Sequence, residues 1–249
     1  MLLRPPLVLV YHGVGDVPAE HDPDRLFVAT RTFIGQIRSL RRRGYGFVTV
    51  AQFAERLRGG AQLDGRCAVT FDDGGADNAE ELAAVTQALE VPVTLYVRVD
   101  LLGGPHPFVA PESGRRLMDA DQLRDLARLP GIEIGSHTRT HRDLSRVDVN
   151  EAFEEMSSSK TALEELVDRE VVSFAYPSCG YSEDCPAAAE LAGYTSAVTC
   201  GPRGGRSPYE LRRDMIGTHD RGLRFALKSR GAAHAARRPR RWLTEVRRP

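Results

Sequence analysis

Short apolar runs alternate with longer segments of helical periodicity along this sequence. Runs such as VTV, PVTLYV and VVSFAY carry β-branched residues at successive positions, which is typical of strands buried on both faces. The expected strands are 7–12, 46–50, 67–72, 93–97, 132–136, 171–176, 196–199 and 214–216. This alternation predicts right-handed parallel βαβ units.

A closed barrel and an open doubly wound sheet would both satisfy this alternation. Eight strand candidates and about seven helices favour the barrel, and 249 residues suit one such domain. The glycine fingerprint of dinucleotide-binding folds is absent after the first strand, where HGVGDV lacks the third glycine. We therefore expect an α/β barrel over residues 1–230 and a basic tail over 231–249.

Helix signals mark several segments between the strands. The segment 32–44 has Thr32 as its expected N-cap and Gly44 as its expected C′ glycine. The segment 119–131 begins with acidic residues and stops at a Pro-Gly pair. The segment 98–118 is instead rich in Gly and Pro, which predicts a surface loop near the carboxyl end of a strand, where barrels concentrate functional residues.

Charge is uneven along the chain, although the formal net charge is zero. Residues 221–249 hold ten Lys or Arg and one acid, Glu245, a net of +9, so the remainder carries a net of −9. A solvated helix with a frayed tail explains this end. Weak contact with a polyanion or an acidic membrane surface is the alternative. Only Trp242 is aromatic within 237–249, so specific nucleic-acid binding is not expected.

Compartment signals are sparse. No stretch reaches the roughly 18 uncharged apolar residues of a membrane span, and the apolar run 7–11 is shorter than a signal-peptide h-region. These observations predict a cytoplasmic protein. The cysteines form no C-x-x-C motif, so without an export signal we expect reduced thiols, with Cys67 filling the core. The four are Cys67, Cys179, Cys185 and Cys200.

The strongest local signal is AVTFDDGG, residues 68–75, in which a buried strand runs into Asp72 and Asp73. Two adjacent carboxylates are costly unless a positive group compensates them, and a bound cation does so. The alternative from this motif alone is that one aspartate caps the next helix, near Ala76, while the other is solvated.

The second signal is IEIGSHTRTHRDLS, residues 132–145. If the chain turns helical after Ser136, His137 and His141 stack on one face and can bind one divalent metal. An isolated pair of this kind is more often two surface histidines. Here both motifs follow buried parallel strands, whose carboxyl ends open on one face of a barrel. One Asp and two His then leave open positions for water and substrate, and the second Asp can act as a general base.

The motifs together resemble those of the polysaccharide deacetylases, the NodB-homology group of carbohydrate esterases. TFDDG and HTRTH carry the resemblance, and VLVYHGVG, SFAYPSCGYS and LRRDMIG are similar to its flanking motifs. The resemblance covers roughly residues 7–228. It implies a distorted (β/α)7-type barrel and a metal-dependent hydrolase that removes an acetyl group from an N-acetylated sugar or related amide.

The resemblance also implies roles for individual residues. Asp72 would be the catalytic base, and Ser178 would offer its backbone N–H to the oxyanion, with Tyr176 in the same oxyanion or substrate motif. Three residues would ligate one divalent metal: Asp73, His137 and His141. The metal is most often zinc in this family, with cobalt, nickel, manganese or iron as alternatives.

This sequence departs from the family pattern in two places. Many members carry an arginine in the third motif, where this chain has Ala175, and Arg213 is the candidate substitute for steadying the catalytic aspartate. Many members also place a general-acid histidine in a late L-x-H motif, which His219 fits poorly. The branch with YH on its first strand suggests His12 instead, although a structural histidine is the other interpretation. The remaining histidines are treated as surface residues: His21, His106 and His234.

The departures leave a second class of function open, a catalytically impaired barrel that binds glycans or a partner. The sequence does not name the substrate. A nucleotide sugar, a lipid-linked sugar or a small N-acetylated metabolite fits the expected compartment better than a cell-wall polymer. The aromatic content of 7% also disfavours a long glycan groove lined with rings. Nothing in the sequence indicates the oligomeric state.

Overall fold

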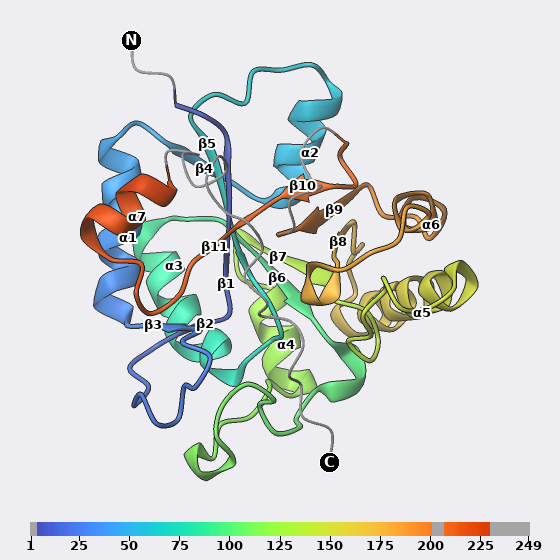
Figure 1. Cartoon of the computed structure of the whole chain (residues 1–249), viewed down its shortest axis with the longest axis horizontal. Coiled ribbons are helices and arrows are strands. Elements are labelled where there is room, and N and C mark those ends of the chain that lie inside the picture. Colours follow the sequence, from blue (N-terminus) through green and yellow to red (C-terminus); the bar gives the residue numbers. More distant parts are fainter. Residues whose placement is uncertain (1–3, 201–206, 230–249) are drawn as a thin grey trace.

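The fold is known from a computed structural model, which describes residues 4–200 and 207–229 (Figure 1). Its main sheet runs in the order β10-β9-β8-β7-β6-β5-β1-β11, and every pairing along this path is parallel. The central strands are β1 (Leu7–Tyr11), β5 (Arg66–Phe71), β6 (Val93–Val97), β7 (Ile132–Ser136), β8 (Ser173–Ala175) and β9 (Ser196–Thr199). The short strand β4 (Gly46–Val48) pairs with the first half of β5.

One short segment brings the two ends of this sheet together. Strand β10 (Leu211–Arg212) pairs with β9, and strand β11 (Asp214–Met215) pairs with β1 at the opposite end. Only Arg213 separates these two strands, so a single crossing segment nearly closes a parallel barrel (Figure 1). The predicted α/β fold and distorted barrel are confirmed, and the strand runs are buried as their apolar pattern requires.

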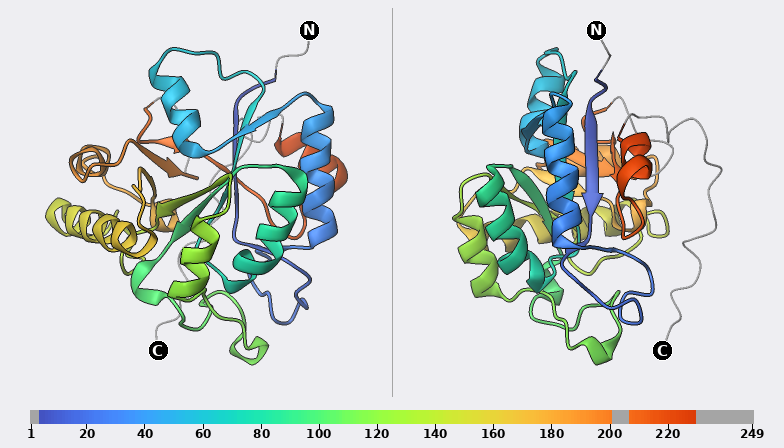
Figure 2. Two further views of the ribbon diagram at one scale, coloured as in Figure 1. Left: turned by 180° about the vertical axis from the view of Figure 1, so that it is seen from behind. Right: turned by 90° about the vertical axis from the view of Figure 1, so that its left-hand side faces the viewer.

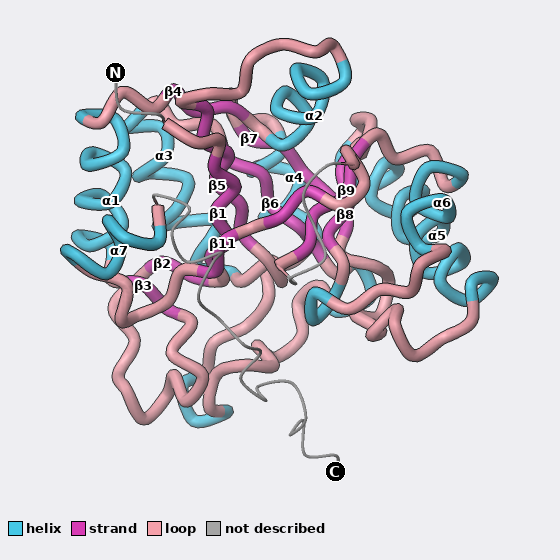
Figure 3. The backbone as a smooth tube through the Cα atoms, turned by 45° about the horizontal axis from the view of Figure 1, so that its top comes forward, coloured by secondary structure: helices cyan, strands magenta, loops and turns pink. Residues whose placement is uncertain are grey.

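Helices surround the strands, while long loops gather at one end of them (Figures 2 and 3). The helices are α1 (Thr30–Arg42), α2 (Val50–Arg58), α3 (Ala83–Leu89), α4 (Ala120–Ala127), α5 (Val149–Val167), α6 (Cys185–Leu191) and α7 (Gly222–Lys228). A π-helical turn, Asn78–Leu82, leads into α3, and 3₁₀ turns span Val99–Leu101, Pro111–Ser113 and Pro177–Cys179. A separate small sheet pairs β2 (Gly13–Val14) with β3 (Phe27–Val28).

Local capping explains several helix boundaries. Asp119 caps α4 by accepting hydrogen bonds from two backbone N–H groups, and Asp148 caps α5 in the same way. The prediction of Thr32 as an N-cap is wrong, because α1 begins at Thr30 and Ala29 occupies the cap. Gly44 is confirmed in its expected place, just past the end of α1 with φ of +83°, a conformation that glycine adopts without strain.

The cysteines do not all follow the sequence expectation. Cys67 and Cys185 are buried free thiols, and Cys67 fills the core as predicted. Cys179 and Cys200, which were expected to be reduced, instead form a disulfide. They follow the adjacent parallel strands β8 and β9, and this neighbourhood places their Cα atoms 5.1 Å apart, within bridging range.

The remaining expectations concern the loop at 98–118 and the chain ends. The loop is only partly a surface loop, because Val109, Leu117 and Met118 are buried. Among the described residues, no helix combines the length and apolar character needed to cross a bilayer. The basic tail at 231–249 lies outside the described residues.

Candidate metal centre and active site

The two aspartates of the DDGG motif follow β5 at the carboxyl end of the barrel. Asp73 and Gly74 have φ of 73° and 74°, and this left-handed turn breaks the alternation that would send adjacent side chains to opposite faces. As a result, Nε2 of His137 lies 3.9 Å from a carboxylate oxygen of each aspartate. The capping alternative is not realised: Asp72 is bonded to Arg213, and both oxygens of Asp73 lack a hydrogen-bond partner in the described chain.

Three side chains form a cluster with the composition of a metal site. One potential ligand atom from each of Asp73, His137 and His141 lies within 4.8 Å of the other two. Asp73 is 2% exposed, and its Oδ1 atom is 3.6 Å from Nε2 of His141. A buried carboxylate whose oxygens both lack a hydrogen bond is costly unless something else compensates its charge. The cluster therefore fits a divalent cation.

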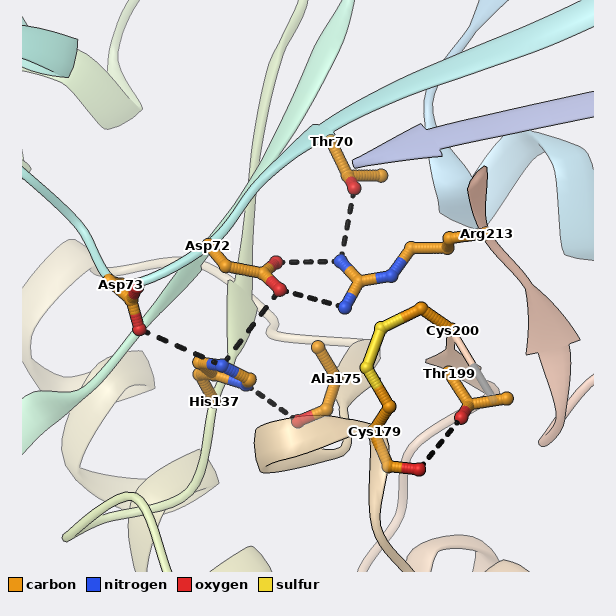
Figure 4. The surroundings of a disulfide bond; sticks show 9 residues. All are labelled: Thr70, Asp72, Asp73, His137, Ala175, Cys179, Thr199, Cys200 and Arg213. Atoms are coloured by element: carbon orange, nitrogen blue, oxygen red, sulfur yellow. Dashed lines mark hydrogen bonds and ion pairs between the residues drawn. A yellow bond between two sulfur atoms is a disulfide. The ribbon is translucent and has the colours of Figure 1, made fainter. Parts of the chain in front are cut away.

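The contacts of His137 fix the direction of its second nitrogen. Its Nδ1 lies 2.8 Å from the carbonyl oxygen of Ala175, so Nδ1 carries the proton and donates to that carbonyl (Figure 4). In this tautomer Nε2 is unprotonated, and its lone pair faces the carboxylates of Asp72 and Asp73. The lone pair and the carboxylates repel one another unless a cation lies between them. This arrangement is the second reason why the residues present fit a metal.

The two histidines meet through a loop, and the predicted helical turn after Ser136 is wrong. Thr138 and His141 both have left-handed backbone conformations, with φ of 62° and 65°. Glu155 on α5 holds the loop by accepting hydrogen bonds from the backbone N–H groups of Arg139 and Thr140. The two imidazole rings consequently lie 4.8 Å apart, edge to face.

Burial and charge together set the protonation of this cluster. Burial lowers the pKa of His137, and with the neighbouring His137 ring it lowers the pKa of His141 to about 3. Both imidazoles are therefore neutral at pH 7, as metal ligation requires. Burial alone would raise the pKa of Asp73, but the Arg98 guanidinium and the imidazoles outweigh it and hold the pKa well below its usual range.

Asp72 is clamped by a buried arginine from the crossing segment. Arg213 donates from Nη1 to Oδ1 at 2.6 Å and from Nη2 to Oδ2 at 2.8 Å, and Nη1 also lies 3.1 Å from Oγ1 of Thr70 (Figure 4). Arg213 is fully buried, with its guanidinium over the ring of Tyr96. Burial would raise the pKa of Asp72, but Arg213 and His137 lower it overall, so the carboxylate is ionised.

The turn after β8 carries the expected oxyanion residue. Ser178 is exposed and has φ of 53°, and its backbone N–H makes no hydrogen bond to any described residue. The following residue, Cys179, is tied to the end of β9 by its disulfide, and its carbonyl accepts a hydrogen bond from Thr199 (Figure 4). Ala175, at the start of this turn, contacts His137 directly. The turn thus lies beside the metal cluster.

Tyr176 is not brought to the site as the motif had suggested. Its hydroxyl donates to the carbonyl oxygen of Tyr209, and its backbone N–H donates to that of Val198. The ring is fully buried and stacks on Tyr181. The hydroxyl and the backbone N–H of Tyr176 thus both donate within the barrel wall, and neither is free to donate to a substrate.

The candidate general acids differ sharply in placement. His12 follows β1, is partly buried, and carries a buried Nδ1 atom with no hydrogen-bond partner among the described residues. Its ring lies 6.5 Å from that of Phe108, which is itself 6.1 Å from the ring of His141. His219 is exposed, and no side-chain contact joins it to the metal cluster in the described chain.

Two residues of the site were missed in the sequence. His106 was treated as a surface residue, but it is 4% exposed and packs against Phe27 and Phe108. Arg98 follows β6 directly, is 3% exposed, and places Nε 3.4 Å from Oδ1 of Asp73. The one available signal was a lone arginine immediately after a buried strand in YVRVD.

An Asp-His-His cluster beside a second, arginine-held aspartate, at the mouth of a parallel barrel, is an arrangement that suits a hydrolase. A family model described as polysaccharide deacetylase matches residues 60–197, and the chain belongs to this family. The resemblance noted in the sequence is thereby confirmed. The family comprises carbohydrate esterases, hydrolases that remove acetyl groups and in general depend on a metal.

Known relatives agree with this assignment. YxkH of Bacillus subtilis (strain 168), named as a polysaccharide deacetylase, is 25% identical over 196 residues, which are 78% of this chain and 64% of that relative. The chain thus matches slightly less than two thirds of that relative's length.

Solved structures share the fold. BC0361, a polysaccharide deacetylase from Bacillus cereus, matches with a TM-score of 0.73 at 23% identity, over 90% of this chain and 68% of that one. The deacetylase PplD of Streptococcus pyogenes, solved in complex with acetate, matches with a TM-score of 0.74 at 19% identity, over 90% of this chain and 97% of that one. At these identities the likeness shows the barrel fold alone.

Proposed function

We propose that this protein is a metal-dependent deacetylase that hydrolyses the N-acetyl group of an N-acetylated sugar or related amide. The observation that carries the proposal is the convergence of Asp73, His137 and His141 on one point, beside a second aspartate held by a buried arginine. The products would be acetate and a free amine.

Asp73, His137 and His141 would hold the ion, and their one oxygen and two nitrogen donors suit zinc, with cobalt, nickel, manganese or iron as alternatives. A divalent ion bound there supplies a Lewis acid that polarises the acetyl carbonyl and lowers the pKa of water. Asp72 would take the proton of the attacking water. Arg213 would keep this carboxylate ionised and in one orientation through its two hydrogen bonds.

The remaining roles are an oxyanion donor and a general acid. The backbone N–H of Ser178, which makes no hydrogen bond to a described residue, would donate to the oxygen that becomes negative during attack. His12 would protonate the amine nitrogen as the C–N bond breaks, because its ring lies near Phe108 at the mouth of the barrel and its buried Nδ1 has no partner within residues 4–200 and 207–229. We favour His12 over His219, which is exposed and has no side-chain contact with the metal cluster among the described residues.

The disulfide bears on the compartment and hence on the substrate. Disulfides persist in oxidising environments and are rare in reducing ones, so the pair Cys179–Cys200 argues against the cytoplasmic location expected from the sequence. We propose an oxidising compartment instead. N-acetylated glycans outside the cytoplasm are therefore substrates to include beside small N-acetylated metabolites.

The sequence also suggested a non-catalytic binding protein and a membrane contact through the basic tail. The non-catalytic binder was motivated by the missing arginine of the third motif, and Arg213 stands at the catalytic aspartate in its place. A contact between the basic tail and an anionic membrane surface stays a proposal. Its signature is retention on anionic vesicles that weakens as salt is raised, and retention independent of salt would contradict it.

Paired substitutions of the two aspartates test the proposal. Asp73→Ala should lose both bound metal and acetate release, whereas Asp72→Asn should keep the metal and lose acetate release. Elemental analysis of the purified protein and an acetate assay over N-acetylated sugars measure both. Asp125→Asn, at an exposed position on α4, is the matched control and should change neither. Full activity of Asp72→Asn would refute the assignment of the base.

A further inference from the structure

Arg98 is a buried cation whose hydrogen-bonding edge has no acceptor. It lies at the carboxyl end of β6 and is 3% exposed. Its Nε and Nη2 atoms are buried and make no hydrogen bond within the described part of the chain. A guanidinium cannot discharge itself by losing a proton, so burying unpaired N–H groups of this kind is costly. Such an edge points to a ligand that supplies the acceptor.

The nearby carboxylates do not supply that acceptor. Asp73 approaches Nε of Arg98 only to 3.4 Å and without hydrogen-bond geometry, and its oxygens belong to the metal cluster. Asp72 already receives both hydrogen bonds from Arg213. Within the described part of the chain, neither carboxylate therefore accepts a hydrogen bond from Nε or Nη2 of Arg98.

The surroundings place this edge beside the metal cluster. The ring of Phe108 covers the guanidinium of Arg98 at 5.7 Å from Cζ and also borders the rings of His12 and His141. Arg98, His12 and His141 therefore lie around one ring, next to the metal cluster. Nε and Nη2 form the side of a guanidinium that presents two parallel N–H groups, a spacing that matches the two oxygens of a carboxylate.

We infer that Arg98 binds a carboxylate of the substrate, close to the acetamido group that is hydrolysed. The inference rests on the proposed deacetylase function and adds the class of substrate: an N-acetylated amino sugar that carries a carboxylic acid. Arg98 is then a specificity-determining residue of the site. A neutral N-acetylated sugar leaves its two N–H groups without an acceptor and is a poorer substrate.

A matched pair of probes isolates the carboxylate. N-acetylmuramic acid and its methyl ester differ at one group, which is an anionic carboxylate in the acid and a neutral ester with one more methyl in the other, and the metal-loaded full chain is assayed with each. We expect kcat/KM for the acid to exceed that for the ester at least tenfold, because a charge-assisted bidentate contact is lost in the ester. Arg98→Gln should reduce this ratio to near one, and Arg98→Lys should keep part of it. Arg128→Gln, at the exposed C-cap of α4, should not change it.

The ratio within one preparation does not depend on how much of the protein is folded or metal-loaded, so a weaker Arg98→Gln variant still gives an answer. An acid-to-ester ratio near one in the unsubstituted protein would overturn the inference, even if both probes are deacetylated. Preference for N-acetylglucosamine 6-phosphate over the acid would overturn the choice of carboxylate.

Binding gives a readout that is independent of turnover. In calorimetry with metal-loaded Asp72→Asn, the acid should bind at least tenfold more tightly than the ester, and adding Arg98→Gln should abolish the difference. Arg98-dependent binding without acetate release in the unsubstituted protein would support the anion site while refuting the deacetylase. Acetate release without any such difference would do the reverse.

Discussion

Replacing Arg213 by methionine tests whether the buried clamp on Asp72 holds the site together. Methionine keeps an unbranched apolar stem but is shorter and has no charge. Asp72, which is 4% exposed, then either stays ionised without its cation or takes up a proton. The same change leaves the backbone hydrogen bond from Arg213 N–H to Thr199 intact, so the barrel closure is retained. The perturbation thus acts on the side-chain contact.

The structure sets the size of the effect. Two charge-assisted hydrogen bonds of 2.6 and 2.8 Å are lost, and removing one partner of a buried pair costs about 3–5 kcal/mol because the other charge is left uncompensated. Asp72→Asn leaves the charge of Arg213 uncompensated at a similar cost, although Thr70 still accepts a hydrogen bond from it. The double variant removes both charges, so its cost should fall about 2 kcal/mol short of the sum of the single costs.

Urea unfolding of the single and double variants measures this coupling. The exposed pair Arg128–Asp125 is the control cycle, since a contact of 2.9 Å between side chains more than two-thirds exposed should couple by well under about 1 kcal/mol. Acetate release is followed in parallel: Arg213→Met should lower kcat more than tenfold with its metal content unchanged, and Arg213→Lys should recover part of kcat. Additive costs at the buried pair, or an unchanged kcat, would refute the clamp.

Two other perturbations concern stability. Replacing both Cys179 and Cys200 by serine opens a loop with a sequence separation of 21, which should lower the free energy of unfolding by about 3 kcal/mol; equal urea midpoints with and without the bridge would contradict this. Burial raises the pKa of Asp77 from 3.8 to about 6, so the folded state binds a proton more tightly and native stability should fall as pH rises from 4 to 6. Asp77→Asn should therefore be more stable than the unsubstituted protein at pH 7, by about 1–2 kcal/mol, and no more stable at pH 4; thermal melts at the two pH values decide this.

The barrel was readable from the sequence because its strands are buried on both faces. Successive β-branched positions in 93–97 and 171–176 have no amphipathic alternative, so the pattern indicates parallel strands covered by helices. The motif aspartates and histidines could then be placed at one end, because parallel strands share a direction. The pattern did not predict the closing segment. Its two strands are too short to give a sequence signal, and they form because they pair with β9 and β1.

Details of the site depended on contacts that no local pattern encodes. The histidine spacing suggested a helix, but Thr138 and His141 adopt left-handed conformations because Glu155, on a distant helix, holds the loop between them. His106 had no recognisable sequence signal, because it is a single histidine in a Gly- and Pro-rich loop. It is buried because it packs against Phe27. The disulfide likewise depends on the order of β8 and β9 in the sheet.

The crossing segment links the fold to the chemistry of the site. Arg213 separates the two strands that pair with opposite ends of the sheet. The segment that closes the barrel therefore also places a guanidinium beside Asp72. The family resemblance suggested an arginine in the third motif, but this chain has Ala175 at that position, at the end of β8. The carbonyl oxygen of Ala175 accepts a hydrogen bond from His137. The cation at Asp72 therefore comes from the segment between β10 and β11 and not from the third motif, and an ionised aspartate in a buried site needs such a fixed cation.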